Sequence, residues 1–150
     1  MPILFALAGK QCGLDMDGTL LVPESGITAH GRLVEAEVAT AVTTVGAATL
    51  TAAAFVGGVI IRSGSTGAYS DTTPTATQIL ALIANPQIGS TFRLRIVNTV
   101  AFIETILAGT GVTLAQVTAV AASSFRDYVI RVTNVQTPAV TMTGIGGGPI

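Results

Sequence analysis

The side chains that could take part in catalysis lie almost entirely near the start of this 150-residue chain. Lys10, Cys12, Asp15, Asp17 and His30 supply an amine, a thiol, two carboxylates and an imidazole, the groups that act as nucleophiles and as general acids or bases. After His30 there is no further lysine, cysteine or histidine. The rest of the chain therefore favours a structural or binding role, and we expect no enzyme activity.

One of these segments has the pattern of an enzyme motif. Leu14–Leu21 (Leu-Asp-Met-Asp-Gly-Thr-Leu-Leu) resembles the first motif of haloacid-dehalogenase-type phosphatases, in which the first aspartate is the nucleophile and the second a general acid and base. That motif follows a buried strand, and Lys10–Gly13 is a poor candidate for one. No lysine follows to neutralise a phosphoryl group, and Asp71 and Asp127 stand alone rather than as an adjacent magnesium-binding pair. We therefore interpret the motif as an acidic turn.

The other ionisable residues form no recognisable catalytic set. His30 lies in a turn-like segment far from any Gly-x-Ser-x-Gly elbow, which indicates a solvated loop histidine. Asp71, Glu104 and Asp127 are not paired in the way that a glycosidase requires, and we expect them to hydrogen-bond in turns or to pair with arginine. We expect neither a metal site nor a cofactor.

Four arginines could form an interaction surface. Two of them alternate with apolar residues in a predicted strand over Thr91–Val97, and two lie near the last strands. They are Arg93, Arg95, Arg126 and Arg131. Such a row suits an acidic partner surface or salt bridges between protomers, and a solvated sheet face is the alternative. Tyr69 is the single aromatic residue of the loop Ser63–Thr73, which is either a recognition tip or a polar connection.

Charge and hydropathy narrow the choice of partners. The formal net charge is −1 and 10% of residues are charged, so the sequence has no basic footprint for nucleic acid. The mean hydropathy is +0.69, and Val38–Ile61 is an uncharged run of 24 residues, long enough to cross a bilayer. That run contains one Leu, five Thr and three Gly, and its flanks have no aromatic or basic anchor beyond Arg62, which disfavours a membrane span. We expect apolar surface to be buried against copies of the chain or a large partner.

The strand patterns predict a mainly β fold. The 22 threonines, together with abundant Ala, Val and Ile, suit half-buried strands. Residues 1–42 lack a long regular pattern and are predicted to form an extended N-terminal arm, although Leu33–Val42 alternates like a first strand or a short helix. Residues 43–150 are predicted to form the folded domain. Its strands are expected within Ala47–Arg62, as two strands or one bulged strand, and over Thr91–Val97, Ala101–Leu107, Val112–Ala121, Tyr128–Thr133 and Ala139–Thr143.

One short helix interrupts the predicted strands. Thr73 is its expected cap, Pro74 its first residue, and Asn85-Pro86 its end. Gly146–Gly148 is expected to be a flexible terminus. Many short strands with one helix predict a jelly-roll-like antiparallel β-sandwich.

Four segments of the domain form a pattern that resembles a viral family. They are Ala53–Ala76, Ile88–Phe92, Asn98–Phe102 and Ala108–Thr113. This pattern is similar to small structural proteins of tailed bacteriophages, above all the cement or decoration proteins on the outside of the capsid. It covers about residues 43–145 and rests on turns and strands. The resemblance implies a β-sandwich that forms oligomers and clamps neighbouring subunits of the major capsid protein.

The location and contacts of such a protein follow from the resemblance. It would be assembled in the bacterial host cytoplasm and lie on the virion exterior, as a homo-oligomer for which a trimer is favoured over a dimer. Residues 1–42 and the arginine-bearing face would touch the coat subunits. The alternative from another class is a virion fibre or receptor-binding module, with the loop Ser63–Thr73 as its host-facing tip.

Overall fold

The computed structural model describes residues 4–7, 10–14, 20–21 and 37–150, and it divides the chain into the units Met1–Glu35 and Ala36–Ile150. In the first unit, three short strands form an antiparallel sheet in the order β1-β2-β3. They are β1 (Leu4–Leu7), β2 (Lys10–Leu14) and β3 (Leu20–Leu21). Asp15, Asp17 and His30, which the sequence singled out, lie outside the described residues.

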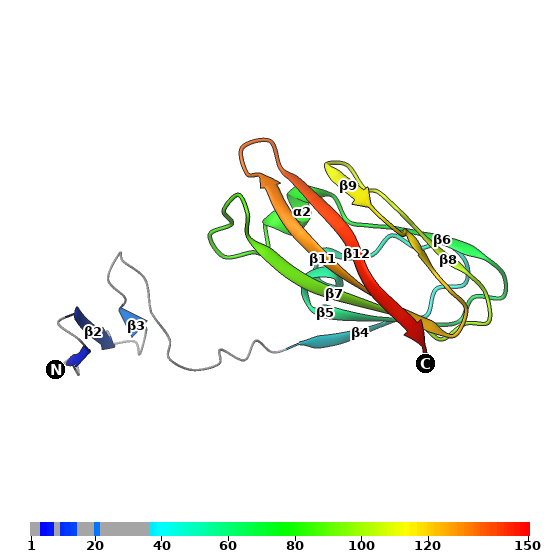
Figure 1. The fold of residues 1–150 in the computed structure, drawn as a ribbon, viewed down its shortest axis with the longest axis horizontal. Coiled ribbons are helices and arrows are strands. Elements are labelled where there is room, and N and C mark those ends of the chain that lie inside the picture. The colour runs from blue at the N-terminus through cyan, green and yellow to red at the C-terminus, as the bar shows by residue number, and fades with distance from the viewer. Residues whose placement is uncertain (1–3, 8–9, 15–19, 22–36) are drawn as a thin grey trace. The chain divides into compact units, whose positions relative to one another are not determined.

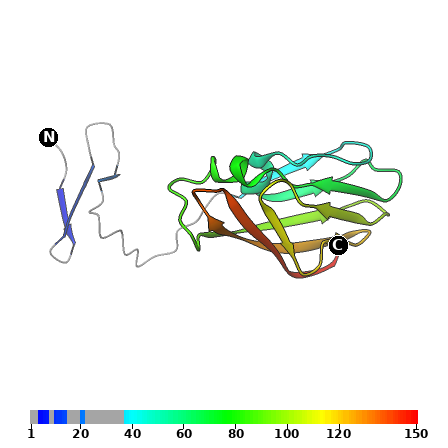
Figure 2. The same ribbon diagram turned by 90° about the horizontal axis from the view of Figure 1, so that it is seen from above.

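The second unit, called the main unit below, is mainly β and contains two sheets (Figures 1 and 2). The large sheet has the order β4-β5-β7-β11-β12-β9, and the small sheet has the order β10-β8-β6. The large sheet comprises β4 (Val38–Val42), β5 (Gly58–Arg62), β7 (Thr91–Asn98), β11 (Ser124–Asn134), β12 (Ala139–Pro149) and β9 (Val112–Ala115). The small sheet comprises β10 (Ala119–Val120), β8 (Glu104–Leu107) and β6 (Tyr69–Thr72). The prediction of a mainly β fold is thus confirmed.

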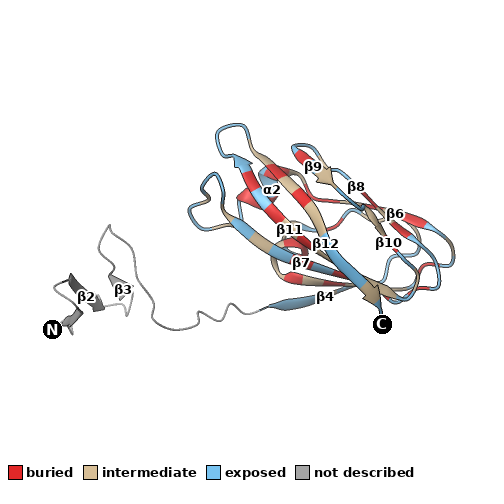
Figure 3. Cartoon of the chain, viewed as in Figure 1, coloured by how far each residue is buried: buried red, intermediate tan, exposed pale blue. Residues whose placement is uncertain are grey.

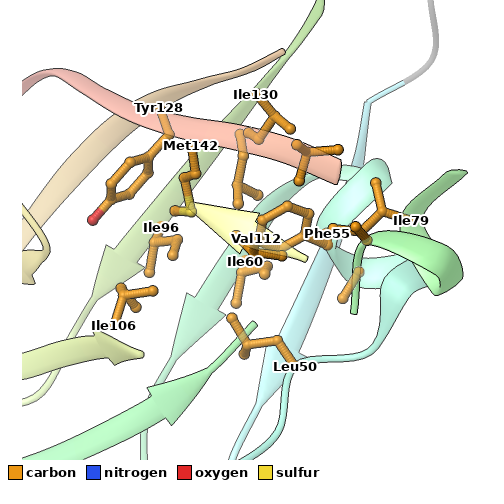
Figure 4. Packing of buried hydrophobic residues seen from close by; sticks show 14 of the residues in the cluster. Leu50, Phe55, Ile60, Ile79, Ile96, Ile106, Val112, Tyr128, Ile130 and Met142 are labelled. Carbon is orange, nitrogen blue, oxygen red and sulfur yellow. The ribbon is translucent and has the colours of Figure 1, made fainter. Parts of the chain in front are cut away.

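Both sheets contribute to one hydrophobic core. Ile96 of β7 and Met142 of β12 belong to the same buried cluster as Ile106 of β8 (Figure 4). Phe55 and Ile79, from the two short helices, also belong to that cluster. The small sheet therefore packs on one face of the large sheet. Along the strands of the large sheet, the residues that face away from the core alternate with the buried residues and are more exposed (Figure 3).

The strand directions differ from the predicted antiparallel arrangement. The pairs β7–β11, β11–β12 and β8–β10 are antiparallel, but β4–β5, β5–β7, β9–β12 and β6–β8 are parallel. Parallel neighbours require a crossover connection, and helix α1 (Ala52–Val56) lies in the connection between β4 and β5. The large sheet is therefore mixed.

Helix α1 was not expected from the sequence, which predicted strands throughout Ala47–Arg62. The Thr51 side chain caps this helix by accepting a hydrogen bond from Ala54 N at 3.2 Å. Three successive alanines favour the helical conformation. Gly57 ends the helix, and Gly58 starts β5 with φ of +99°, a backbone conformation that glycine adopts without strain. The glycine pair is thus a helix-to-strand junction rather than a bulge.

The predicted helix is present as α2 (Ala76–Leu80), but its cap is Thr75 and not Thr73. Thr75 and Gln78 form a capping box, in which each side chain hydrogen-bonds the other residue's backbone N–H. Thr73 is buried and instead accepts a hydrogen bond from Gly109 N at 2.9 Å. It fixes the β8–β9 connection against the helix entry.

The C-terminal glycines are part of a strand, contrary to the expected flexible terminus. Gly146, Gly147 and Gly148 pair with Asp127, Arg126 and Phe125 of β11. A Cβ atom on Gly147 would lie 2.6 Å from the Phe125 carbonyl oxygen, so this close approach requires a glycine. The glycines therefore permit the pairing that extends β12 to Pro149.

The main unit begins before the predicted domain boundary. Strand β4 (Val38–Val42) is part of the large sheet, although the sequence analysis placed these residues in the arm. The uncharged run Val38–Ile61 is divided among β4, α1 and β5. Within the part of the chain that the structure describes, no helix is both long enough and apolar enough to cross a membrane.

Candidate interaction surface

The outer face of β7 and β11 carries three of the four arginines that the sequence singled out. Strand β7 alternates strictly, because Leu94 and Ile96 are buried whereas Arg93 and Arg95 are exposed. This confirms the predicted facing of Thr91–Val97. Residues Arg131, Asp127 and Phe125 of β11 share the outer side, since they lie opposite Thr91, Arg95 and Val97. We call the residues Arg93, Arg95, Phe125, Asp127 and Arg131 the arginine face.

Arg95 and Asp127 form the central ion pair of the arginine face. Arg95 Nε donates to Asp127 Oδ1 at 2.6 Å, and Nη2 donates to Oδ2 at 2.8 Å. This two-point geometry holds the pKa of Asp127 below its usual range and raises the pKa of Arg95. The guanidinium carbon also lies 4.4 Å from the centre of the Phe125 ring. Arg95 is thereby fixed in place on an exposed sheet.

Beside this pair is a partly open hollow with a volume of about 240 Å³. Charged side chains of both signs line it, together with residues of β5. The lining residues are Glu37, Gly58, Val59, Arg93, Leu94, Arg95 and Asp127. Arg93 and Arg131 have no ion-pair partner among the residues from Glu37 onward. Their guanidinium groups can donate hydrogen bonds to a carboxylate or another anionic group of a partner.

The structure does not place Arg126 or Tyr69 on this surface. Arg126 lies opposite Ile96 on the inner side of β11, and its Nε atom is buried without a hydrogen-bond partner in the described chain. Tyr69 begins β6 and is 6% exposed. Its hydroxyl donates to Asn98 Oδ1 at 3.0 Å. Tyr69 is therefore an interior residue of this chain, and an exposed contact role for it is corrected.

The interior contains a second arginine–aspartate pair, which the sequence analysis did not single out. Arg62 ends β5, Asp71 lies in β6, and both side chains are fully buried. Arg62 Nε donates to Asp71 Oδ2, and Nη2 donates to Oδ1 at 3.2 Å. Burial alone would lower the pKa of Arg62, but the hydrogen bond and charge of Asp71 outweigh burial and raise that pKa. The pair joins the two sheets.

Arg62 also holds the chain that follows β4. Its Nη1 atom donates to the carbonyl oxygens of Val42 at 3.1 Å and Thr44 at 2.8 Å. Its Nη2 atom donates to the carbonyl oxygen of Gly46. The Tyr69 ring covers the guanidinium at 4.5 Å. Apart from the bonds to Asp71, all described hydrogen bonds of the Arg62 side chain go to backbone carbonyl oxygens, which indicates a structural role.

Glu104 is the least satisfied member of this interior network. Its Oε2 accepts from the Tyr69 hydroxyl at 3.4 Å, but its Oε1 has no hydrogen-bond partner among the described residues. Burial, and secondarily the charge of Asp71, raises the pKa of Glu104 from its usual 4.5 to about 8. At neutral pH this carboxyl is therefore protonated. A neutral carboxyl is the form that the interior tolerates.

Two of the acidic side chains pair with arginine, as predicted from the sequence. Asp71 and Asp127 each pair with an arginine. From Glu37 onward and in the described strands before it, no group of three His, Cys, Asp or Glu residues is placed to hold a metal ion. One signal for the buried pair is visible in the sequence, because Arg62 directly ends the uncharged run Val38–Ile61. A single charge at the end of an apolar strand is either solvated or paired inside.

Comparison of the chain with protein-family models, with curated proteins and with solved structures finds no match.

Proposed function

We propose that this protein is a non-enzymatic capsid cement or decoration protein of a tailed bacteriophage. It binds the outer surface of the mature head and stabilises contacts between subunits of the major capsid protein. The jelly-roll-like class and the trimeric state that accompany the sequence resemblance belong to this proposal. So does its location on the virion exterior after assembly in the host cytoplasm.

The arginine face is the observation that supports this proposal most directly. Arg93 and Arg131 are exposed, have no ion-pair partner from Glu37 onward, and stand on an open sheet rather than inside a closed cavity. An open sheet face suits a broad protein surface more than a small molecule, because a small molecule is usually enclosed by its site. Neighbouring coat subunits that present carboxylates would complement this face.

Linkage explains how binding would stabilise a capsid. A protein that binds the assembled lattice and not its separated subunits shifts the equilibrium toward the lattice. The effect grows with the number of copies bound. No chemical step is needed.

The alternative, a fibre or receptor-binding module, was based on the loop Ser63–Thr73 with Tyr69 at its tip. In the structure Tyr69 is buried, and Ser65 Oγ donates back to the Gly67 carbonyl oxygen at 3.0 Å. The described loop thus has no exposed aromatic residue. We therefore place the cement function first.

The test is binding to expanded capsids of the phage that encodes the chain, measured by co-sedimentation. Arg93→Gln together with Arg131→Gln is expected to weaken binding at least about tenfold, because two charge-assisted contacts are lost. Gln136→Glu together with Thr137→Glu, in the exposed turn between β11 and β12, changes the net charge by the same amount and is expected to bind like the wild type.

Abundance in the virion separates the two functions. Quantitative mass spectrometry of purified virions should find this chain at a copy number close to that of the major capsid protein. A few copies per virion would favour the fibre function instead. Complete absence from virions, or equal loss of binding in both double variants, would overturn the proposal.

A further inference from the structure

Among the residues from Glu37 onward, no strand pairs with the outer edge of β4 (Val38–Val42), which leaves one edge of the large sheet open. Strand β4 stands at the end of the strand order, pairs with β5, and is the longest of the four edge strands of the main unit (Figure 1). Val38 is 57% exposed, and Ala39 and Ala41 are also exposed. Figure 3 shows β4 mostly in the colour of exposed residues. Edge strands are usually protected by a lysine, a proline or a bulge, and β4 has none of these.

The hydrogen bonds of β4 show which backbone groups face the open edge. Val38 N donates to Gly57 O at 2.7 Å, and Val42 O accepts from Ser63 N at 3.1 Å. Every second residue of a strand directs both its N–H and its C=O to the same edge. The backbone groups of Val38, Thr40 and Val42 therefore face β5. The N–H and C=O groups of Ala39 and Ala41 therefore point to the open edge.

The sequence of β4 is the same in both directions, since Val-Ala-Thr-Ala-Val is a palindrome centred on Thr40. An antiparallel two-fold pairing centred on Thr40 places identical residue types opposite each other along the whole strand. It also places Ala39 opposite Ala41 of the second copy, so that the four open backbone groups of each strand find partners. The positions of the backbone groups that face the open edge and the palindromic sequence thus favour the same register.

We propose that β4 pairs antiparallel with β4 of a second copy of this chain, about a two-fold axis at Thr40. The large sheets of both copies become continuous. The exposed Val38 packs beside Val42 of the second copy, and the two Thr40 side chains meet at the axis. Glu37 lies opposite Thr43 of the second copy, so the two Glu37 carboxylates are far apart and do not repel. An isologous contact of this kind closes as a dimer, so this pairing would replace the trimer that the sequence resemblance favours.

A cysteine scan tests the register on the full chain with Cys12→Ser. Thr40→Cys is expected to form a covalent dimer on mild oxidation, because opposite residues of a non-hydrogen-bonded antiparallel pair have Cα atoms about 4.5 Å apart, within disulfide range. Ala39→Cys is the matched control, since the two copies of residue 39 are offset by two positions along the strands, beyond the about 7 Å limit. Cross-linking through Ala39→Cys but not Thr40→Cys would overturn the register.

Sedimentation of the unmodified chain tests the dimer itself. We expect a species of twice the 15.1 kDa chain mass. Ala41→Pro, which removes an N–H directed to the open edge, should raise the dimer dissociation constant at least about tenfold, whereas Ala41→Ser should not. Equal thermal unfolding midpoints of the two variants, measured at protein concentrations below the dimer dissociation constant, verify that the fold is intact. A wild-type monomer, or a trimer unaffected by Ala41→Pro, would overturn the pairing.

Discussion

The same pair of side chains, arginine with aspartate, occurs twice in the main unit with opposite surroundings. Arg62 and Asp71 are both fully buried between the sheets, whereas Arg95 and Asp127 are 49% and 30% exposed on the outer face. Both pairs have two-point geometry. The hydrogen-bonding groups of the buried pair must all find partners within the protein, because water does not reach them. The exposed pair can exchange its partners. Surroundings, and not residue type, thus separate a structural pair from an interaction surface.

The largest expected effect is that of breaking the buried pair. Asp71→Asn leaves the Arg62 charge in the interior without its counter-ion, and we expect the free energy of unfolding to fall by about 3–5 kcal/mol. Urea denaturation at pH 7 measures this change. The loop after β4 should also lose amide-exchange protection, since Arg62 holds its carbonyl groups. A loss no larger than that of Asp127→Asn would contradict the contrast between the pairs.

The next effect concerns pH and isolates Glu104. Its pKa is about 8 in the folded state against the usual 4.5, so the folded chain binds one proton more than the unfolded chain between these values. Stability should therefore decrease as the pH rises from about 4.5 to about 8 and then level off. Glu104→Gln carries no titrating proton and should lose this slope. Identical slopes for both proteins would exclude Glu104 as the cause.

A smaller effect is expected from the hydroxyl that links the buried groups. Tyr69→Phe removes the hydrogen bonds to Asn98 and Glu104 but leaves the ring over Arg62. We expect a loss of about 1 kcal/mol in the free energy of unfolding, typical of one net hydrogen bond. The same denaturation experiment measures it. A loss as large as that of Asp71→Asn would show that the hydroxyl, and not the ion pair, dominates the network.

The smallest effect is expected at the exposed pair. Asp127→Asn should change the free energy of unfolding by less than about 1 kcal/mol at low salt, and the change should disappear near 1 M salt because exposed charges are screened. Parallel urea titrations at both salt concentrations measure this. A loss that persists at high salt would mean that Arg95 and Asp127 act as a buried pair.

The arginine face was partly predictable from the sequence, for a physical reason. Phe92–Ile96 alternates between apolar and charged residues, so the facing of Arg93 and Arg95 follows from the two-residue period of a strand. The facing of Arg126 did not follow, because the sequence predicted a strand only from Tyr128 while β11 begins at Ser124. Without the strand start, no period assigns Arg126 to a face.

The sheet directions and the buried pair needed information that local patterns do not contain. Parallel pairing of β4 with β5 depends on a crossover, and helix α1 within it is only five residues long. The pairing of Arg62 with Asp71 spans both sheets, although the two residues are nine positions apart. Tyr69 was interpreted as part of a loop for the same reason, because the small sheet that buries it is assembled from β8 and β10, far along the chain.

The central position of β11 has a consequence for the order in which the chain folds. Within the main unit, β11 and β12 form the one pair of strands that are both adjacent in sequence and antiparallel, and β11 also pairs with β7. Such a hairpin closes a short loop, whereas the partners of β5 and β7 are distant in sequence and cost more loop-closure entropy. Strands β4, β5 and β7 leave the ribosome before β11, so β7 has no partner on its β11 side until Ser124–Asn134 has been synthesised. During that interval the edge of β7 that later receives β11 is open to pairing with a strand of another nascent chain.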